Sequence, residues 1–473
     1  MRYNRITPEI AASLSEIVGE NFVIYNDPER LEPYSHDEIP EKKYAAMPEA
    51  VVRPRTADEI SRIMKLANEF RFPVTPRGAG SGLSGGAVPI HGGIVLHCDR
   101  MNEILELDKE NMMLTVEPGV VANDINEFLK PHGLFYAGYP MSMETCYIGG
   151  NVAENAGGGK AVKYGVTGRY VLGLETVMPN GDIVWFGGKL IKDVTGYNMI
   201  QLMTGSEGTL GIFSKIVLKL IPLPRYQVDL LCLFKSSQEA INIVPRIITG
   251  TGIIPTGIEF MDRTACREAC EYLNESIPYQ DSGAMVIITV DGASRENVES
   301  EYETLGEMCM ENGAIEVYVA DNVTTSERIW KVRRNIGEAY NVISRRQSGE
   351  DIVVPPAAMA QMVEKLSQLA QNFGVMIPCF GHAGDGNLHA RIVSDPKWSD
   401  EKWHQVLPEI LERLYKLTSE LGGSISGEHG IGHKRKNYMP MFVSDEYLNI
   451  LKSIKKSLDP NFILNPGKIF DSL

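Results

Sequence analysis

The segment Pro76–Gly86, PRGAGSGLSGG, determines how the first half of the chain can fold. Five of its eleven residues are glycine, and its central part, GSGLSG, matches the dinucleotide-binding pattern G-x-G-x-x-G. That pattern requires a helix to begin within it, so that the helix N-terminus faces a pyrophosphate. Here the chain continues as GAVPIHGGIV, and Pro89 is incompatible with the interior of such a helix. We therefore predict a loop whose backbone N–H groups bind an anion, helped by the charge of Arg77; the alternative is a tight connection between strands.

Two further glycine-rich segments follow in the same half of the chain. YIGGNVAENAGGGKAVKYG spans residues 147–165, and TGSEGTLGIFSKIVLKL spans residues 204–220. Asn151 and Asn155 in the first of them can donate or accept hydrogen bonds at the edge of a planar ligand. Three separated glycine-rich clusters favour a long ligand bound in an extended form, and FAD fits such a site better than a mononucleotide does.

The chain is long enough for more than one hydrophobic core. It has 473 residues, and single cores stop growing at about 250–300 residues. Two prolines end the run KIVLKLIPLP, so a domain boundary is predicted near Leu223. Beyond it, runs such as VDLLCLF and AMVIITVDG are typical of strands, and RENVESEYETLGEMCMENG is typical of a helix. This alternation predicts an α+β domain with an antiparallel sheet.

Composition and charge exclude several classes of protein. The 46 basic and 61 acidic residues give a net charge of −15 without any Lys/Arg-rich block, so no nucleic-acid partner is expected. No apolar run is long enough to predict a transmembrane segment, and the first twenty residues are typical of an amphipathic helix with Thr7 as its N-cap rather than of a signal peptide. The seven cysteines include no C-x-x-C pair, which argues against a disulfide framework or an iron–sulfur cluster and favours a cytoplasmic location. Cys266 and Cys270, four residues apart, are expected to pack in a core.

Another segment, CFGHAGDGNLHARI (379–392), carries two histidines seven residues apart. VMIPCFG (375–381) and LHARIVS (388–394) are predicted to be strands, and HAGDGN between them a tight turn. Such a hairpin would place His382 close to His389, with Arg391 on the same face of the second strand as His389. Three interpretations remain open: hydrogen-bonded core histidines, a structural metal site, or a metal site with an open position for substrate.

The segment SISGEHGIGHKRK (424–436) offers the carboxylate that a metal site would need. Two imidazoles and one carboxylate form a common three-ligand set that leaves a position open for substrate, and Glu428 is the candidate. His433, next to Lys434 and Arg435, is expected to be a solvated surface group.

As a set, these motifs resemble those of the FAD-linked D-2-hydroxyacid dehydrogenases. That family lies within the vanillyl-alcohol-oxidase-like flavoproteins and includes D-lactate dehydrogenases and the flavin subunit of glycolate oxidase. The similar segments cover nearly the whole chain: PRGAGSGLSGG, VEPGV, IGGNVAENAGGGKAVKYGVTGRYVLGLE, DVTGYNMIQLMTGSEGTLGI and DPNFILNPGKIF. The resemblance implies an α+β fold with a vanillyl-alcohol-oxidase-type FAD-binding domain of two α+β subdomains (1–223), a C-terminal α+β cap domain with an antiparallel sheet (224–423) and a C-terminal segment (424–473) that returns to the FAD-binding domain.

The resemblance also implies that FAD lies across the N-terminal half, with its pyrophosphate at Gly78–Gly82. Some relatives bind FAD covalently through a histidine in the first glycine loop. Ser81 stands where such a histidine would be, so non-covalent FAD is expected. The residues expected to contact FAD are Arg77, Gly78, Ala79, Gly80, Ser81, Gly82, Pro118, Gly119, Gly149, Gly150, Asn151, Asn155, Gly157, Gly158, Gly211, Ile212 and Asn465.

By the same resemblance, HAGDGNLH and SGEHG supply a metal site and a catalytic base. The implied ligands of one divalent ion (zinc, iron or manganese) are His382, His389 and Glu428, and the implied general base is His429. The implied reaction is the oxidation of a small D-2-hydroxy acid to the 2-oxo acid, with metal-assisted hydride transfer to flavin N5.

Substrate and electron acceptor follow from the same comparison. Arg333 and Tyr164 match residues on the substrate side of the family's site. Some relatives carry a lysine near Gly349, and its absence here favours a substrate without a distal carboxylate, with D-lactate as the expected one. Electrons are expected to pass to a partner protein such as an electron-transferring flavoprotein. The alternatives are a glycolate oxidase flavin subunit that passes electrons to an iron–sulfur partner, and a non-catalytic flavin-binding electron carrier with a structural metal.

Overall fold

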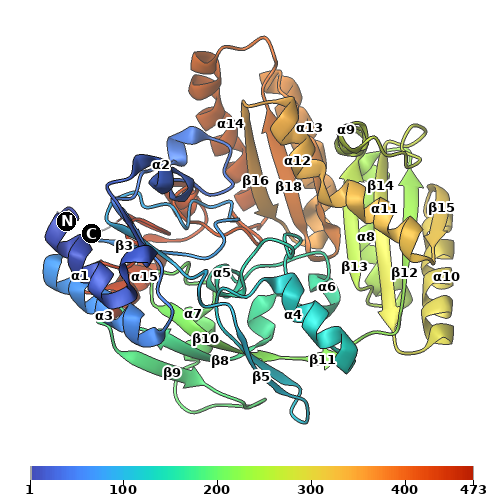
Figure 1. Cartoon of the computed structure of the whole chain (residues 1–473). Coiled ribbons are helices and arrows are strands. Elements are labelled where there is room, and N and C mark those ends of the chain that lie inside the picture. The colour runs from blue at the N-terminus through green and yellow to red at the C-terminus, as the bar shows by residue number, and fades with distance from the viewer. Residues whose placement is uncertain (1–2, 472–473) are drawn as a thin grey trace. The chain divides into compact units, whose positions relative to one another are not determined.

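A computed structural model describes residues 3–471, so the first two residues of the predicted FAD-binding domain and the last two of the predicted C-terminal segment lie outside it (Figure 1). The chain divides into two compact units. Unit 1 comprises residues 1–157, 166–223 and 428–473, and unit 2 comprises residues 158–165 and 224–427. The cut at Leu223 falls between the two prolines: Pro222 is the last residue of β11 (Ile221–Pro222), and Pro224 is the first residue after the cut. The short segment 158–165 belongs to unit 2, and the C-terminal part of unit 1 begins at Glu428.

A small, mainly parallel sheet in unit 1 positions the first glycine loop. Its strand order is β1-β2-β4-β3, with β1 (Val23–Tyr25), β2 (Ala50–Val52), β3 (Val74–Arg77) and β4 (Ile94–His97). The helices α1 (Pro8–Val18) and α3 (Ala57–Phe70) bury apolar side chains against it, including Leu14 and Ile63. The side chain of Thr7 caps α1, as predicted. Residues 78–93, which follow β3, contain no helix, so the prediction that this loop is not a dinucleotide-binding βαβ turn is confirmed.

A second sheet of unit 1 is antiparallel and holds the other glycine-rich segments. Its order is β5-β6-β10-β8-β9, with β5 (Ile104–Asp108), β6 (Met113–Val116), β8 (Val171–Val177), β9 (Ile183–Gly187) and β10 (Ile212–Lys219). The remaining elements of this part are α4 (Ala122–Leu129), α5 (Ile148–Glu154), α7 (Met199–Met203) and the pairing of β7 (Leu134–Phe135) with β11. The end of the chain, after α15 (Asp445–Leu458), lies along β3, because Asn465 N donates to Val74 O at 2.8 Å.

Unit 2 is built on one seven-stranded antiparallel sheet (Figure 1). Its order is β15-β12-β14-β13-β17-β18-β16, with β12 (Tyr226–Phe234), β13 (Gly257–Asp262), β14 (Ala284–Gly292), β15 (Ala314–Ala320), β16 (Gln347–Val353), β17 (Cys379–His382) and β18 (Asn387–Val393). The predicted antiparallel sheet is thereby confirmed. Among the described residues, no helix is long and apolar enough to cross a membrane.

Helices cover both faces of this sheet. One apolar core joins strand residues to α9 (Arg263–Leu273), α11 (Val323–Arg334) and α12 (Ile336–Ile343), and it includes Cys266 and Cys270, as predicted. The helices α8 (Ser237–Thr251) and α10 (Arg295–Glu311) contact β12 and β14, and α13 (Met359–Phe373) packs on α8 and on α14 (Asp400–Glu420). The strand predicted from Val375 begins only at Cys379, because Pro378 has no N–H for a continuing ladder.

Candidate functional site

The first glycine loop starts at the carboxyl end of β3, where its backbone is shaped by one buried arginine. Arg77 is 8% exposed and donates to the carbonyl oxygens of His36 (2.7 Å) and Pro33 (3.2 Å). Gly80 has φ +80°, and a Cβ there would overlap the Arg77 guanidinium. The loop therefore needs glycine at this position, because the guanidinium of Arg77 packs directly against the backbone of Gly80.

Three of the predicted FAD-binding segments meet in unit 1. A Cβ on Gly78 would lie 3.6 Å from the N atom of Gly150, and Gly149 N donates to Pro118 O at 2.8 Å. A Cβ on Gly149 would overlap Pro118, whereas a Cβ on Gly150 would meet nothing within 4 Å. The bare backbone therefore leaves an open face at Gly150, and these residues fit a cofactor that approaches the main chain closely.

The other predicted FAD residues have varied positions. Asn155 accepts from Gly168 N at 2.8 Å, and Asn465 Nδ2 donates to the carbonyl oxygens of Gly86 (3.0 Å) and Glu207 (2.8 Å). Gly211 directly precedes β10, and a Cβ there would overlap the Thr176 side chain. Gly119 is packed against the carbonyl groups of Cys98 and Met101. Gly158 belongs to unit 2. Their contacts with FAD remain predictions.

The two histidines of the hairpin come together in unit 2. A short 3₁₀ turn, Ala383–Asp385, joins β17 to β18, and the imidazole centroids of His382 and His389 lie 5.5 Å apart. Gly381 has φ +155°, and a Cβ there would overlap Asn387 O, so glycine is required for this reversal. The ring of Phe380 stacks on His389 at 5.2 Å between centroids and fixes the ring from one side.

Glu259 on β13 holds His382 in a defined orientation. His382 is 4% exposed and Glu259 is fully buried, and His382 Nδ1 lies 2.6 Å from Glu259 Oε1. Glu259 Oε2 accepts from Arg333 Nε (2.8 Å) and pairs with Arg333 Nη2 (2.6 Å). Burial alone would raise the pKa of Glu259, but its contacts with His382 and with the charged Arg333, including their hydrogen bonds, hold that pKa below its ordinary value. Because a carboxylate only accepts, Nδ1 carries the proton and Nε2 keeps the lone pair that a metal needs.

Asp351 on β16 is a second buried carboxylate, and it lies next to His389 across the sheet. The two residues are cross-strand partners, and ligand atoms of both lie within 4.8 Å of one another. Asp351 is fully buried and accepts from Asn387 Nδ2 (2.6 Å), Ser426 Oγ (2.7 Å) and Gly427 N (3.0 Å). Glu428 follows Gly427 directly in the sequence, and within unit 1 its Oε1 lies 3.6 Å from His429 Nε2.

The two imidazoles of the hairpin and the carboxylates beside them fit a divalent transition metal. Imidazole nitrogens with carboxylates suit zinc, iron or manganese, and each imidazole of the hairpin has a buried carboxylate next to it. Sequence reasoning missed Glu259 and Asp351. The available signal was a charged residue inside an apolar strand, as in GIEFMD and EDIVV, since buried carboxylates are rarely kept without partners.

The residues predicted to bind the substrate carboxylate already have protein partners. Arg333 pairs with Glu259, Tyr164 OH donates to Asp291 Oδ1 at 2.8 Å, and Arg391 Nη1 donates to Gln347 Oε1 at 2.6 Å. Their roles toward a substrate stay predictions.

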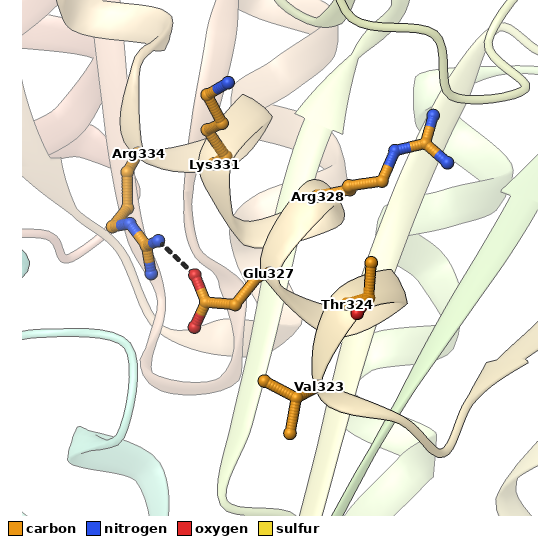
Figure 2. A pocket seen from close by; sticks show the side chains of 6 residues that line it. All are labelled: Val323, Thr324, Glu327, Arg328, Lys331 and Arg334. Atoms are coloured by element: carbon orange, nitrogen blue, oxygen red, sulfur yellow. Dashed lines mark hydrogen bonds and ion pairs between the residues drawn. The ribbon is translucent and has the colours of Figure 1, made fainter.

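Figure 2 shows a separate surface hollow of about 410 Å³ on α11, lined by Val323, Thr324, Glu327, Arg328, Lys331 and Arg334. Glu327 and Arg334 form an ion pair at 2.8 Å across it. Arg333, on the same helix, is 4% exposed and turned toward Glu259. Adjacent helix residues point about 100° apart, so Arg334, which lines the hollow, and Arg333, which pairs with Glu259, lie on different sides of α11.

The expectation for His433 was wrong. The side chain is half-buried, its ring packs edge-on against Tyr44, and burial lowers its pKa to about 4. Its neighbours Lys434 and Arg435 are 6% and 0% exposed. A run of basic residues thus lies inside unit 1, where the buried carboxyl group of Glu207 interacts electrostatically with Arg435.

Replacing Glu259 by glutamine is expected to weaken metal binding about 10- to 100-fold, the range typical of lost partners behind a metal-binding histidine. The change also leaves Arg333 buried without its counter-ion, which should lower the free energy of unfolding by about 3–5 kcal/mol. Competition with a chromophoric chelator measures the first effect and urea unfolding the second. A double variant, Glu259→Leu with Arg333→Met, should regain stability but not metal affinity. Regained affinity would show that Glu259 does not orient His382.

Two family matches cover most of the chain. The family described as "FAD binding domain" matches residues 48–187, and the family described as "FAD linked oxidases, C-terminal domain" matches residues 223–469.

Individual relatives match over their full length. The chain is 40% identical to glycolate oxidase subunit GlcD of Bacillus subtilis, covering 98% of this chain and 97% of the relative. It is 36% identical to D-lactate dehydrogenase of Anaerostipes hadrus, covering 99% and 98%. Among solved structures, p-cresol methylhydroxylase aligns with a TM-score of 0.80 at 16% identity, covering 98% of this chain and 96% of that one. The predicted vanillyl-alcohol-oxidase-type fold is therefore confirmed, and the chain belongs to the family of FAD-linked oxidases, as an FAD-dependent oxidoreductase related to D-lactate dehydrogenases and glycolate oxidase subunits.

Proposed function

We propose that this oxidoreductase converts a small D-2-hydroxy acid, D-lactate, to the 2-oxo acid, with a divalent ion held by His382, His389 and Glu428. The observation that carries the proposal is the imidazole pair of the β17–β18 hairpin, 5.5 Å apart and backed by a buried carboxylate. Relatives named D-lactate dehydrogenase and glycolate oxidase subunit support the substrate class.

FAD and the divalent ion would supply different parts of the chemistry. When bound, FAD supplies the acceptor for the hydride that leaves the substrate Cα, and a divalent ion supplies a Lewis acid that lowers the pKa of the substrate hydroxyl. The FAD would be held without a covalent bond by the segments around Gly78, Pro118 and Gly150, since Ser81 replaces the histidine of covalent relatives.

The residues of the chain move the proton and orient the substrate. His429 takes the hydroxyl proton, because an unperturbed imidazole titrates near neutral pH and can accept and release a proton in each turnover. Glu428 lies 3.6 Å from His429, so the proposed metal ligand and the proposed base are neighbours. Arg333 and Tyr164 face the substrate carboxylate in this proposal. The proton is thus removed as the hydride leaves, which balances the two-electron oxidation.

Substrate size follows from the surroundings of Gly349. A Cβ at this position would lie 3.6 Å from Arg391 Nη2, and no lysine is present there to bind a second carboxylate. A short substrate such as D-lactate is therefore favoured over D-2-hydroxyglutarate.

Anaerobic mixing of the purified flavoprotein with single substrates tests the proposal. We expect D-lactate to bleach the flavin band near ~450 nm faster than L-lactate, glycolate or D-2-hydroxyglutarate. Chelator treatment should abolish bleaching, and one added divalent ion per chain should restore it. Faster bleaching by glycolate would identify the chain as a glycolate-oxidising subunit, in line with its GlcD relatives. A yellow protein that no hydroxy acid bleaches would be a non-catalytic electron carrier.

The reduced flavin would pass its electrons to a partner protein. All seven cysteines are buried free thiols, and none of them is part of a C-x-x-C pair. We propose an electron-transferring flavoprotein as the acceptor, with an iron–sulfur subunit as the alternative, and rapid reoxidation by one of these, but not by oxygen, would identify it.

A further inference from the structure

The segment Ser426–Gly432 carries both Glu428 and His429, and a buried carboxylate holds the backbone on each side of that pair. On the N-terminal side, within unit 2, Asp351 accepts from Ser426 Oγ (2.7 Å) and Gly427 N (3.0 Å). On the C-terminal side, within unit 1, Glu207 accepts from Ile431 N (2.8 Å) and Gly432 N (2.6 Å). Both carboxylates thus bind main-chain groups of the segment that holds the proposed ligand and base.

Asp351 also reaches the histidine hairpin. Its second oxygen accepts from Asn387 Nδ2 at 2.6 Å, in the turn between His382 and His389. A Cβ on Gly427 would overlap Asn387 Nδ2 and Val353, so Gly427 packs against the first residue of β18. One buried carboxylate therefore fixes the histidine loop and the residue before Glu428 with respect to each other.

Glu207 is itself held firmly in unit 1. Its N–H donates to Ala153 O at 2.8 Å, its carbonyl accepts from Asn465, and its side chain is 7% exposed. It adopts φ +53°, an unfavourable region for glutamate, which the surrounding hydrogen bonds must enforce. The two hydrogen bonds from Ile431 N and Gly432 N to the Glu207 carboxylate fix the orientation of both peptide planes. In addition, Arg435 Nη1 donates to Gly430 O at 3.1 Å.

We propose that Asp351 and Glu207 are positioning residues: Asp351 sets the place of Glu428 for metal binding, and Glu207 sets the place of His429 for proton transfer. The inference rests on the proposed function of Glu428 and His429. It assigns separate effects to the two carboxylates, because Gly427 adjoins Glu428 and Ile431 follows His429 by two residues.

The test compares Asp351→Asn and Glu207→Gln with matched controls. Asp229→Asn is the control in unit 2, because Asp229 is fully buried and accepts from the hydroxyls of Thr289 and Ser326. Glu175→Gln is the control in unit 1, because Glu175 is 8% exposed and accepts from Ser214 Oγ at 2.9 Å and Lys215 Nζ at 3.1 Å. In each pair a buried carboxylate that accepts hydrogen bonds becomes an amide, so a general loss of stability affects both members.

The readouts are metal affinity of the metal-free flavoprotein, by chelator competition, and the limiting rate of flavin reduction by D-lactate. Asp351→Asn should weaken metal binding about 10- to 100-fold while Asp229→Asn leaves it unchanged. Glu207→Gln should keep metal affinity within about threefold but lower the limiting reduction rate about tenfold or more at an unchanged substrate Kd. If Asp351→Asn does not fold, Ser426→Ala removes one of the three bonds, and it should weaken metal binding about two- to tenfold.

Two outcomes overturn the inference. Equal metal affinity in Asp351→Asn and Asp229→Asn would show that Asp351 does not position Glu428. A Glu207→Gln variant that reduces its flavin as fast as Glu175→Gln would show that Glu207 does not position His429. In both cases the wild-type protein still binds metal and still reacts with D-lactate. A wild-type protein that does neither would contradict the proposed function instead.

Discussion

The His389→Ala variant is expected to retain FAD and to lose its divalent ion. His389 supplies one of two proposed nitrogen donors, and two remaining ligands do not form a stable site for zinc, iron or manganese. Loss of a Lewis acid costs several kcal/mol of transition-state stabilisation, so the rate of flavin reduction by D-lactate should fall about 10³-fold or more. Elemental analysis and stopped-flow absorbance measure the two effects on the same sample.

His404→Ala is the matched control for this change, because His404 is an exposed histidine on α14. It should keep full metal content and an unchanged rate. A His389→Ala protein that keeps stoichiometric metal would show that this ring is a packing residue against Phe380, and the metal site would then have to be sought elsewhere.

The His429→Gln variant is expected to keep both FAD and metal while losing most of the reduction rate. Glutamine can still form hydrogen bonds but cannot accept a proton near neutral pH, and a positioned general base contributes about 10²- to 10⁴-fold. The rate should fall by that factor with little change in substrate Kd. Stopped-flow reduction from pH 5 to pH 9 should show a rise with pH in the wild-type protein that the variant lacks. An unchanged rate and pH profile would assign the proton to another acceptor.

The glycine loops were the features most accessible to sequence reasoning. Pro89 excluded a helix after Gly80, and the chain from Gly78 to Gly93 indeed contains none. A proline or a run of glycines restricts the local backbone directly, so such predictions need no knowledge of distant contacts. The histidine turn was predictable for the same reason.

The carboxylates behind the histidines were not predictable in this way. Glu259 and Asp351 lie 123 and 38 residues before their histidines, and the sequence does not show which strands will neighbour the hairpin. Only the order of strands in the sheet of unit 2 brings them to the hairpin. For His433, the prediction assumed that the adjacent basic residues, Lys434 and Arg435, are solvated. Both are buried, and buried acids such as Glu207 lower the free-energy cost of burying these positive charges.

The central claim is that His382, His389 and Glu428 share one divalent ion. Anomalous diffraction from crystals of the native flavoprotein, recorded on both sides of the metal absorption edge, tests it directly. We expect one peak per chain, bonded to an imidazole nitrogen of each histidine and to a carboxylate oxygen of Glu428. Full metal content with the peak at other residues, or crystals without a peak in which the protein still oxidises D-lactate, would contradict it.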